Sequence, residues 1–268
     1  MRQKDYSIGM FDSGVGGTSI WTAINQALPN ESTCYLSDSK NAPYGEKSKE
    51  EIISLSIKNT ELLLNKNCKI IVVACNTATT NAIKYLREHY AVPFIGIEPA
   101  IKPAALQTKT NTIGILATKG TLNSELFEKT SRKIDQEIII KEQVGKGLVA
   151  LIEDGKLHSK EMSDLLNRYL QPMLKERIDC LVLGCTHYPY LIPQIRAIIG
   201  NNIQIIDSGE AVARQTKKVL SQANLLQTEV DKTTLSHQFF INKNKETLAT
   251  LLQESSGKKQ LTIIETDF

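Results

Sequence analysis

Two short apolar runs, 110 residues apart, constrain the fold of this chain more than any other feature. Residues 69–77 (KIIVVACNT) and 179–187 (DCLVLGCTH) each pass from β-branched or leucine residues to a cysteine and then to small polar residues. Continuous apolar runs of this kind are typical of parallel strands that are buried on both faces. Open α/β sheets bind their ligands at the carboxyl ends of such strands. Cys75 and Cys185 therefore stand where a binding site is expected.

Two further pairs of segments repeat at nearly the same offset. Residues 7–13 (SIGMFDS) resemble residues 112–118 (TIGILAT), and residues 94–98 (FIGIE) match residues 203–207 (IQIID). Strands matched at offsets of 105, 110 and 109 residues indicate an internal duplication. Two similar α/β halves that face each other would bring the two cysteine-bearing strand ends to one cleft.

The remaining segments alternate between the patterns of helices and strands. We expect helices at 18–28, 52–64, from after residue 77 to about 90, 148–153, 161–174, 189–198, 211–223 and 246–252, and strands at 33–37, 137–140, 237–241 and 260–264. The segment after residue 207 has no repeat partner, so we expect it to complete the sheet of the first half. The predicted organisation is an α/β fold whose first lobe comprises residues 1–98 plus 208–268 and whose second lobe comprises residues 99–207.

The composition excludes several classes of protein. With 268 residues, 41% hydrophobic and 23% charged, the chain has the composition of an ordinary soluble globular protein. A net charge of +3 without a block of Lys or Arg argues against a nucleic-acid partner. No apolar run approaches the length of about 18 residues that a membrane span needs, and we see no signal peptide. Five cysteines without a C-x-x-C pair argue against a disulfide scaffold and for a reducing cytoplasm.

The two strand-end thiols suggest acid–base chemistry by a pair. The thiolate is the reactive form, and we expect a following helix to lower the pKa of both Cys75 and Cys185. A thiolate on one face of a carbon can remove its proton while a thiol on the opposite face delivers another, which is racemisation. The sequence shows no clear cofactor signature, so we expect no cofactor. Positioning and electrostatics in a dry cleft would then carry the reaction.

Polar residues beside the strand ends are candidates for binding substrate. Asn76, Thr77 and Thr186 could orient a carboxylate, and His187 could transfer a proton. Asp12 ends the first strand, where it either takes part in function or caps the next helix. The glycine-rich loop at 14–17 could bind an anion through free N–H groups or form only a tight turn.

Other chemistries remain open at this point. A zinc site of Cys75, Cys185 and His187 has no apparent fourth ligand, so we expect no metal. A phosphatase loop of the type Cys-x5-Arg is excluded, because Asn81 and Leu191 stand at the arginine positions. A Cys–His hydrolase would leave one thiol without a role. A two-lobed amino-acid binding module without catalysis would explain the duplication but not the thiols.

Four motifs in a fixed order carry a family resemblance. They are FDSGVGG at 11–17, PYG at 43–45, ACNTA at 74–78 and GCTHYP at 184–189. With them, nearly the whole chain resembles the glutamate racemases of the cofactor-independent aspartate/glutamate racemase superfamily. The resemblance implies two lobes related by a pseudo-twofold axis, each a mainly parallel sheet flanked by helices. The active site would lie in the cleft between them.

The same resemblance implies an activity and a set of site residues. The chain would interconvert L- and D-glutamate and supply D-glutamate for peptidoglycan in a bacterial cytoplasm. Cys75 would deprotonate the D enantiomer and Cys185 the L enantiomer, with Asp12 and His187 assisting proton transfer. The implied substrate-binding residues are Asp12, Ser13, Tyr44, Gly45, Asn76, Thr77, Thr186 and His187, with Thr118 and Glu153 as further candidates.

The resemblance also implies which partners to expect. Members of the family are commonly dimers, so we expect a homodimer that binds glutamate and neither nucleic acid nor membrane. Aspartate racemases share the two-thiol logic, so aspartate or another amino acid is the alternative substrate. Some relatives carry an N-terminal extension that responds to a cell-wall precursor. Only a few residues precede the first strand here, so we do not expect that regulation.

Overall fold

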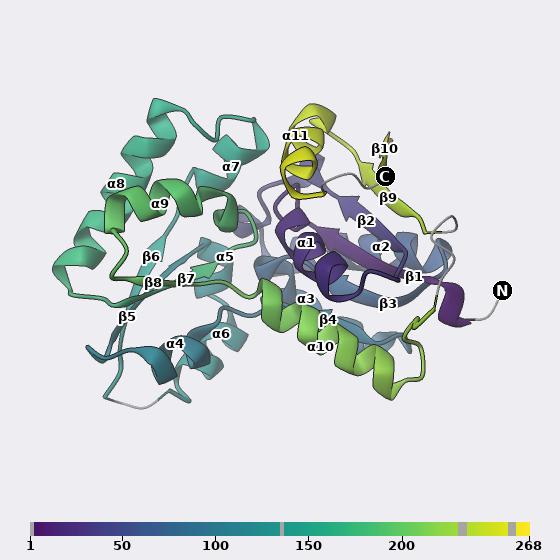
Figure 1. Ribbon diagram of the computed structural model, residues 1–268, viewed down its shortest axis with the longest axis horizontal. Helices are drawn as coiled ribbons and strands as arrows, with labels where there is room; N and C mark the ends of the chain where they lie inside the picture. The colour runs from purple at the N-terminus through teal and green to yellow at the C-terminus, as the bar shows by residue number, and fades with distance from the viewer. Residues whose placement is uncertain (1–2, 135–136, 230–234, 257–260) are drawn as a thin grey trace.

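Two α/β lobes lie side by side in the computed structural model, which describes residues 3–134, 137–229, 235–256 and 261–268 (Figure 1). Among these residues the first lobe contains a six-stranded sheet in the order β10-β9-β2-β1-β3-β4. The second lobe contains a four-stranded sheet in the order β6-β5-β7-β8. All pairings in both sheets are parallel, which confirms the predicted fold class.

The elements of each lobe have the following bounds. The first lobe has strands β1 (Ser7–Asp12), β2 (Thr33–Ser37), β3 (Cys68–Val73), β4 (Phe94–Gly96), β9 (His237–Ile241) and β10 (Leu261–Glu265), with helices α1 (Thr18–Ala27), α2 (Lys49–Asn65), α3 (Asn76–His89), α10 (Gly209–Gln222) and α11 (Lys245–Ser256). The second lobe has strands β5 (Thr112–Ala117), β6 (Ile139–Val144), β7 (Cys180–Gly184) and β8 (Gln204–Ile206), with helices α4 (Ile101–Gln107), α5 (Lys119–Leu122), α6 (Glu125–Ser131), α7 (Leu148–Glu153), α8 (Lys160–Lys175) and α9 (Ile192–Ile199). Short 3-10 helices include η3 (Tyr44–Glu46) and η4 (Tyr188–Leu191).

The strand order repeats between the lobes. In the first sheet β2-β1-β3-β4 has the same order as β6-β5-β7-β8 in the second, as the predicted duplication requires. Strand β9 pairs with β2, and β10 pairs with β9. The prediction that the C-terminal segment completes the first sheet is therefore confirmed. Gln260, where the last strand was expected to begin, lies outside the described residues.

Strand β3 shows why these apolar runs become central strands. Ile70 and Val72 face the core beneath α1, whereas Ile71 and Val73 face the core beneath α2 and α3, and all four are fully buried. This alternation is the period of two that a β-strand imposes. Each fully buried aliphatic side chain contributes about 1.5–3 kcal/mol. Helices α1, α10 and α11 cover one face of the sheet, and α2 and α3 cover the other (Figure 1).

Apart from small shifts in the bounds of other elements, the sequence prediction differs from the structure most clearly in the following segments. Helix α4 was not predicted; it contains Pro103, and proline is tolerated there, since an N–H in the first helical turn needs no partner inside the helix. The helix expected at 189–198 is instead the short η4 followed by α9. The strand expected at 137–140 runs from Ile139 to Val144. Because β6 lies at a sheet edge, the middle of this strand is polar and partly exposed, so its sequence resembles that of a loop.

The chain passes between the lobes twice, after β4 and after β8. The hydroxyl of Ser208 donates a hydrogen bond of 2.7 Å to the backbone carbonyl of Glu98 and joins the two crossings. We propose these crossings as the domain boundaries, as expected at residues 98/99 and 207/208. None of the described helices combines the length and apolar character needed to span a bilayer.

A buried ion pair stabilises the first lobe, and removing one of its partners should lower the free energy of unfolding. Lys69 Nζ lies 2.6 Å from Glu31 Oε2, and the side chains are 0% and 2% exposed. Lys69→Met should lower the free energy of unfolding by about 3–5 kcal/mol, because Glu31 stays buried without its ionic partner. Chemical denaturation at pH 7 measures this. Lys84→Met, at an exposed pair with Glu88, should cost at most about 1 kcal/mol. Equal costs for the two variants would contradict the prediction.

Candidate active site

Both duplicated cysteines line one small cavity between the lobes. The cavity has a volume of only ≈ 10 Å³, which is about the room that one water molecule needs. Entry of a larger ligand therefore requires a movement of the surrounding loops or lobes. The lining residues are Ser13, Pro43, Tyr44, Gly45, Cys75, Asn76 and Thr77 from the first lobe and Thr118, Val149, Cys185, Thr186 and His187 from the second.

The structure brings together the residues singled out from the sequence. All of them line the cavity except Asp12 and Glu153, which lie behind it and bond to residues around it. Two lining residues were not predicted as site residues. Pro43 belongs to a quoted motif but was not singled out, and Val149 has no sequence signal that separates it from other core aliphatic residues.

Cys75 lies between strand β3 and helix α3. It is the N-cap of α3, and its Sγ accepts a hydrogen bond of 3.4 Å from the N–H of Ala78. Its thiol donates toward Ser13 Oγ at 3.7 Å. Burial, and then the charge of Asp12, raise the pKa of the Cys75 thiol well above its ordinary value. The N–H of Ala78 at the start of the helix lowers this pKa, as expected, but in the closed cavity desolvation outweighs the helix terminus.

Asp12 ends strand β1 behind Cys75 and is fully buried. Its Oδ2 accepts a hydrogen bond of 2.7 Å from the N–H of Gly17, and Thr186 Oγ1 lies 3.5 Å from both carboxylate oxygens. Burial raises the pKa of Asp12 to about 6, although the charge of His187 and the Gly17 N–H oppose the rise. A carboxyl group with this pKa can exchange protons near neutral pH.

Cys185 follows strand β7 and lies beside an imidazole. Its Sγ is 3.8 Å from His187 Nδ1, and His187 Nε2 is 2.5 Å from Glu153 Oε1. Burial alone would lower the pKa of His187, but its bonds with Cys185 and Glu153 raise it well above the ordinary value. The raised pKa favours the protonated imidazole, whose Nε2 faces the Glu153 carboxylate and also lies 3.3 Å from the N–H of Gly16, while Nδ1 faces the thiol. Helix α9 begins only after η4, so the expected helix terminus at Cys185 is absent.

The N–H groups of the glycine-rich loop bind side chains of the protein itself. The N–H of Val15 donates to Glu153 Oε1 at 2.7 Å, as the N–H of Gly17 does to Asp12. Glu153 Oε2 also accepts from Ser39 Oγ at 2.7 Å. A Cβ at Gly14 would lie 1.9 Å from Glu153 Oε1, so only glycine fits at this approach. The loop thus positions a carboxylate of the second lobe against the first.

A second contact between the lobes closes the cavity near Tyr44 and Gly45. The Tyr44 hydroxyl donates to Asp38 Oδ2 at 2.5 Å, so it is bonded within the first lobe. A Cβ at Gly45 would lie 2.7 Å from Thr118 Cβ, which shows how closely the lobes approach. Thr77 Oγ1 and Thr118 Oγ1 share a hydrogen bond of 2.8 Å across this seam.

Comparison with known proteins assigns the chain to a family. The model of the Asp/Glu/Hydantoin racemase family matches residues 8–216. The chain belongs to this racemase family. A glutamate racemase of Herpetosiphon aurantiacus is 48% identical over 223 residues, which are 83% of this chain and 88% of that protein.

Solved structures agree with the assignment of this racemase. A glutamate racemase isoform of Bacillus anthracis has a TM-score of 0.86 at 32% identity, over 98% of both chains. The glutamate racemase of Francisella tularensis, solved in complex with D-glutamate, has a TM-score of 0.83 at 26% identity, over 98% of both chains. These matches confirm the family and the fold expected from the four motifs.

The racemase site presents one thiol from each lobe to a closed space. Asp12 stands behind one thiol and His187 beside the other, so each has its own ionisable neighbour. Cys75, Cys185 and His187 do not form a ligand set for a metal ion, and neither do other groups of three or more His, Cys, Asp or Glu side chains in the described ranges. The arrangement is suited to proton transfer at two opposed positions.

Proposed function

We infer that this racemase interconverts L- and D-glutamate by two-base proton transfer at Cα, with Cys75 and Cys185 as the bases. The observation that carries the mechanism is the position of the two thiols. They follow equivalent strands of the duplicated lobes and line the same closed cavity. The glutamate racemases at 48% identity and in the two solved structures support glutamate as the substrate.

The protons balance over one turnover. In the L-to-D direction, the Cys185 thiolate removes the Cα proton and becomes a thiol, while the Cys75 thiol gives its proton to the opposite face. The raised pKa of Cys75 keeps that thiol protonated in the closed cavity, as this direction requires. The reverse direction exchanges the two roles. Asp12 and His187, each near one thiol, assist these transfers and compensate charge in a site that excludes water.

The remaining substrate contacts follow from the cavity lining. Ser13, Asn76, Thr77 and Thr186 are buried polar residues around it and supply donors for the substrate's carboxylates. Tyr44 and Gly45 would bind through groups other than the phenol, which Asp38 already occupies. Thr118 contributes from the facing lobe.

The cellular role and the assembly are also part of this proposal. D-glutamate would serve peptidoglycan synthesis in the cytoplasm, and the enzyme would act as a homodimer without a cofactor. The five cysteines are all free and buried, as suits a reducing compartment. Light scattering during size-exclusion chromatography measures the assembly, and a mass equal to one chain would overturn the dimer.

Proton NMR in D2O tests the proposed reaction directly. With L-glutamate and no added pyridoxal phosphate, the Cα proton signal should disappear while D-glutamate forms. L-aspartate in parallel separates the substrates: exchange of aspartate alone would retain the mechanism and replace the substrate. The absence of exchange with both amino acids, in folded protein, would overturn the racemase. A hydrolase would instead show a covalent adduct and a released product, and a binding module would bind without exchange.

A further inference from the structure

A wider space adjoins the thiol cavity at the contact between the lobes. It has a volume of ≈ 310 Å³, which is enough for a small organic ligand. Four residues line both this space and the thiol cavity: Pro43, Gly45, Thr118 and Val149. These four residues therefore form a partition between the two spaces. We call the wider space the vestibule.

The partition consists of residues from both lobes. Pro43 and Gly45 belong to the first lobe, and Thr118 and Val149 belong to the second. A Cβ at Gly120 would lie 3.1 Å from Gly45 Cα, so the two backbones meet closely beside the partition. Such a contact is not covalent and opens when the lobes separate. Separation would join the vestibule to the cavity, so the vestibule lies on a route to the thiols.

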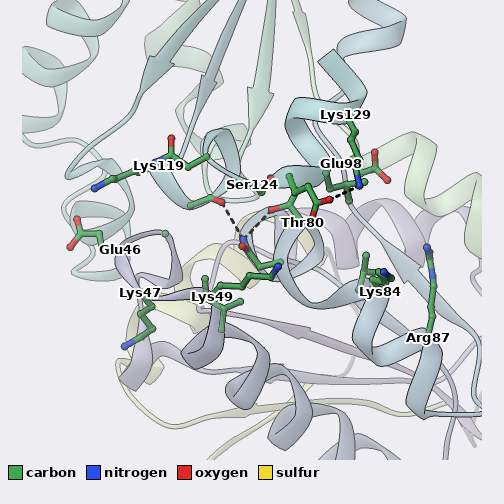
Figure 2. A pocket seen from close by; sticks show the side chains of 18 of the residues that line it. Glu46, Lys47, Lys49, Thr80, Lys84, Arg87, Glu98, Lys119, Ser124 and Lys129 are labelled. Atoms are coloured by element: carbon green, nitrogen blue, oxygen red, sulfur yellow. Dashed lines mark hydrogen bonds and ion pairs between the residues drawn. The ribbon is translucent and has the colours of Figure 1, made fainter. Parts of the chain in front are cut away.

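The charged residues of the vestibule lining are two lysines and one glutamate. Lys119 and Lys146 come from the second lobe, and Glu46 comes from the first. Both lysines are exposed, so the vestibule opens to solvent. Neither lysine has an ion-pair partner within the described ranges. Glu46 and Lys119 also border a larger pocket, and in Figure 2 they extend toward the same edge of it.

Lys146 lies in a loop whose backbone is held by hydrogen bonds. The N–H of Gly145 donates to the carbonyl of Ala117 at 2.9 Å, and the Tyr169 hydroxyl donates to the carbonyl of Lys146 at 2.7 Å. A Cβ at Gly145 would lie 2.3 Å from the hydroxyl oxygen of Tyr188, so glycine is required where the loop meets the lobe. The held backbone therefore places an exposed positive charge at the vestibule.

Lys119 is placed by its neighbour in the chain. It is the first residue of α5, and the N-cap of this helix is Thr118, whose hydroxyl accepts a hydrogen bond of 3.2 Å from the N–H of Thr121. Lys119 therefore follows one member of the partition directly. Lys146 precedes the other member from the second lobe, Val149, by three residues. Both charges thus stand beside the contact that must open.

The thiol cavity itself has little positive charge for an anionic substrate. Among the described residues, its lining contains neither lysine nor arginine, and its histidine, His187, already faces Glu153. Glutamate carries two carboxylates and one ammonium group at neutral pH, so it enters as an anion. The lysines of the vestibule are therefore the positive charges that an entering substrate meets first.

We propose that Lys119 and Lys146 attract the anionic amino acid into the vestibule, from which it enters the thiol cavity when the lobes separate. This inference rests on the proposed racemisation of glutamate and names residues that select for the charge of its substrate. Charges of one sign along a cleft raise the local concentration of an oppositely charged substrate and its rate of association. Glu46 opposes this attraction. Because neither lysine lines the cavity, the effect should appear in kcat/KM and not in kcat.

Initial rates of glutamate racemisation at low and high ionic strength test the proposal. Lys119→Gln/Lys146→Gln should lower kcat/KM about fivefold or more at low salt, with kcat changed by less than about twofold. The loss should shrink to less than about twofold at high salt, which screens exposed charges. Glu46→Gln should raise kcat/KM at low salt by about twofold, because it removes the opposing charge. Lys119→Arg/Lys146→Arg keeps both charges and should keep kcat/KM within about twofold.

The matched control is Lys217→Gln/Lys218→Gln, which removes the same charge from exposed positions on α10. Neither residue lines the vestibule or the thiol cavity, so kcat/KM should change by less than about twofold. Thermal unfolding verifies that each variant is folded. An unchanged kcat/KM in Lys119→Gln/Lys146→Gln, a loss that salt does not reduce, or a loss in Glu46→Gln would overturn the attraction.

Titration calorimetry with L-glutamate separates this inference from the proposed function. Binding requires no turnover, and the bound anion stays near both lysines, so Lys119→Gln/Lys146→Gln should weaken binding about fivefold at low salt. This response without exchange of the Cα proton would overturn racemisation alone. Normal exchange with a kcat/KM that does not respond to the lysines would overturn the attraction alone. The absence of both binding and exchange would overturn both.

Discussion

Cys75→Ser and Cys185→Ser should each lower glutamate racemisation by about 10³-fold or more, in both directions. Each thiol serves one face of Cα, as the base in one direction and as the acid in the other. A serine hydroxyl is far less acidic than a thiol, so it can supply neither function well at neutral pH. General acid–base catalysis by one positioned group contributes about 10²–10⁴-fold. Loss of either thiol therefore interrupts the complete cycle rather than half of it.

Loss of the Cα proton in D2O and the change in optical rotation measure this effect. Cys180→Ser is the matched control. Cys180 is buried at the start of β7, the strand that Cys185 follows, but it does not line the cavity. The variant should keep its activity and lose about 1 kcal/mol of stability, the cost of a buried hydroxyl group. Activity within tenfold of the unchanged enzyme in either cavity variant would remove that thiol from the mechanism.

The positions of the thiols were predictable because they depend on a pattern that the sequence repeats. Parallel strands end at one edge of their sheet, so the residues that follow β1 and β3 meet there. Strand periodicity placed Asp12 and Cys75 at the carboxyl ends of two strands, and the pairing of β1 with β3 brings those ends together. The matched offsets in the second half placed Cys185 opposite them once the halves were taken to face each other.

Contacts between the lobes could not be predicted in this way. The bond between Glu153 and the N–H of Val15 joins residues 138 positions apart and depends on how the lobes pack. Nothing in the local sequence reveals this bond. Its one local requirement is the glycine at position 14, because a side chain there would collide with Glu153. The net pKa of Cys75 could not be predicted for the same reason, because the burial that outweighs the helix terminus depends on how the whole chain packs.

Glu153 is the residue whose role depends most on this packing, and Glu153→Gln should lower kcat by about 10²-fold. The carboxylate is buried, holds His187 at 2.5 Å, and helps to raise the pKa of that imidazole. An amide keeps the shape of the side chain but removes the charge. The pKa of His187 then falls, so the imidazolium is lost at a lower pH than in the unchanged enzyme. Its contribution to catalysis is lost with it.

The pH dependence of kcat separates this positioning role from a structural one. The decline of the rate on the alkaline side should move to lower pH in Glu153→Gln, whereas a loosened site would lower the rate equally at all pH values. His187→Gln should cost a similar amount, and the double variant should cost little more than either single one, because both changes disable the same unit. Glu161→Gln, at an exposed position on α8, is the control and should leave the profile unchanged. An unshifted profile in Glu153→Gln, or fully additive losses, would show that Glu153 does not act through His187.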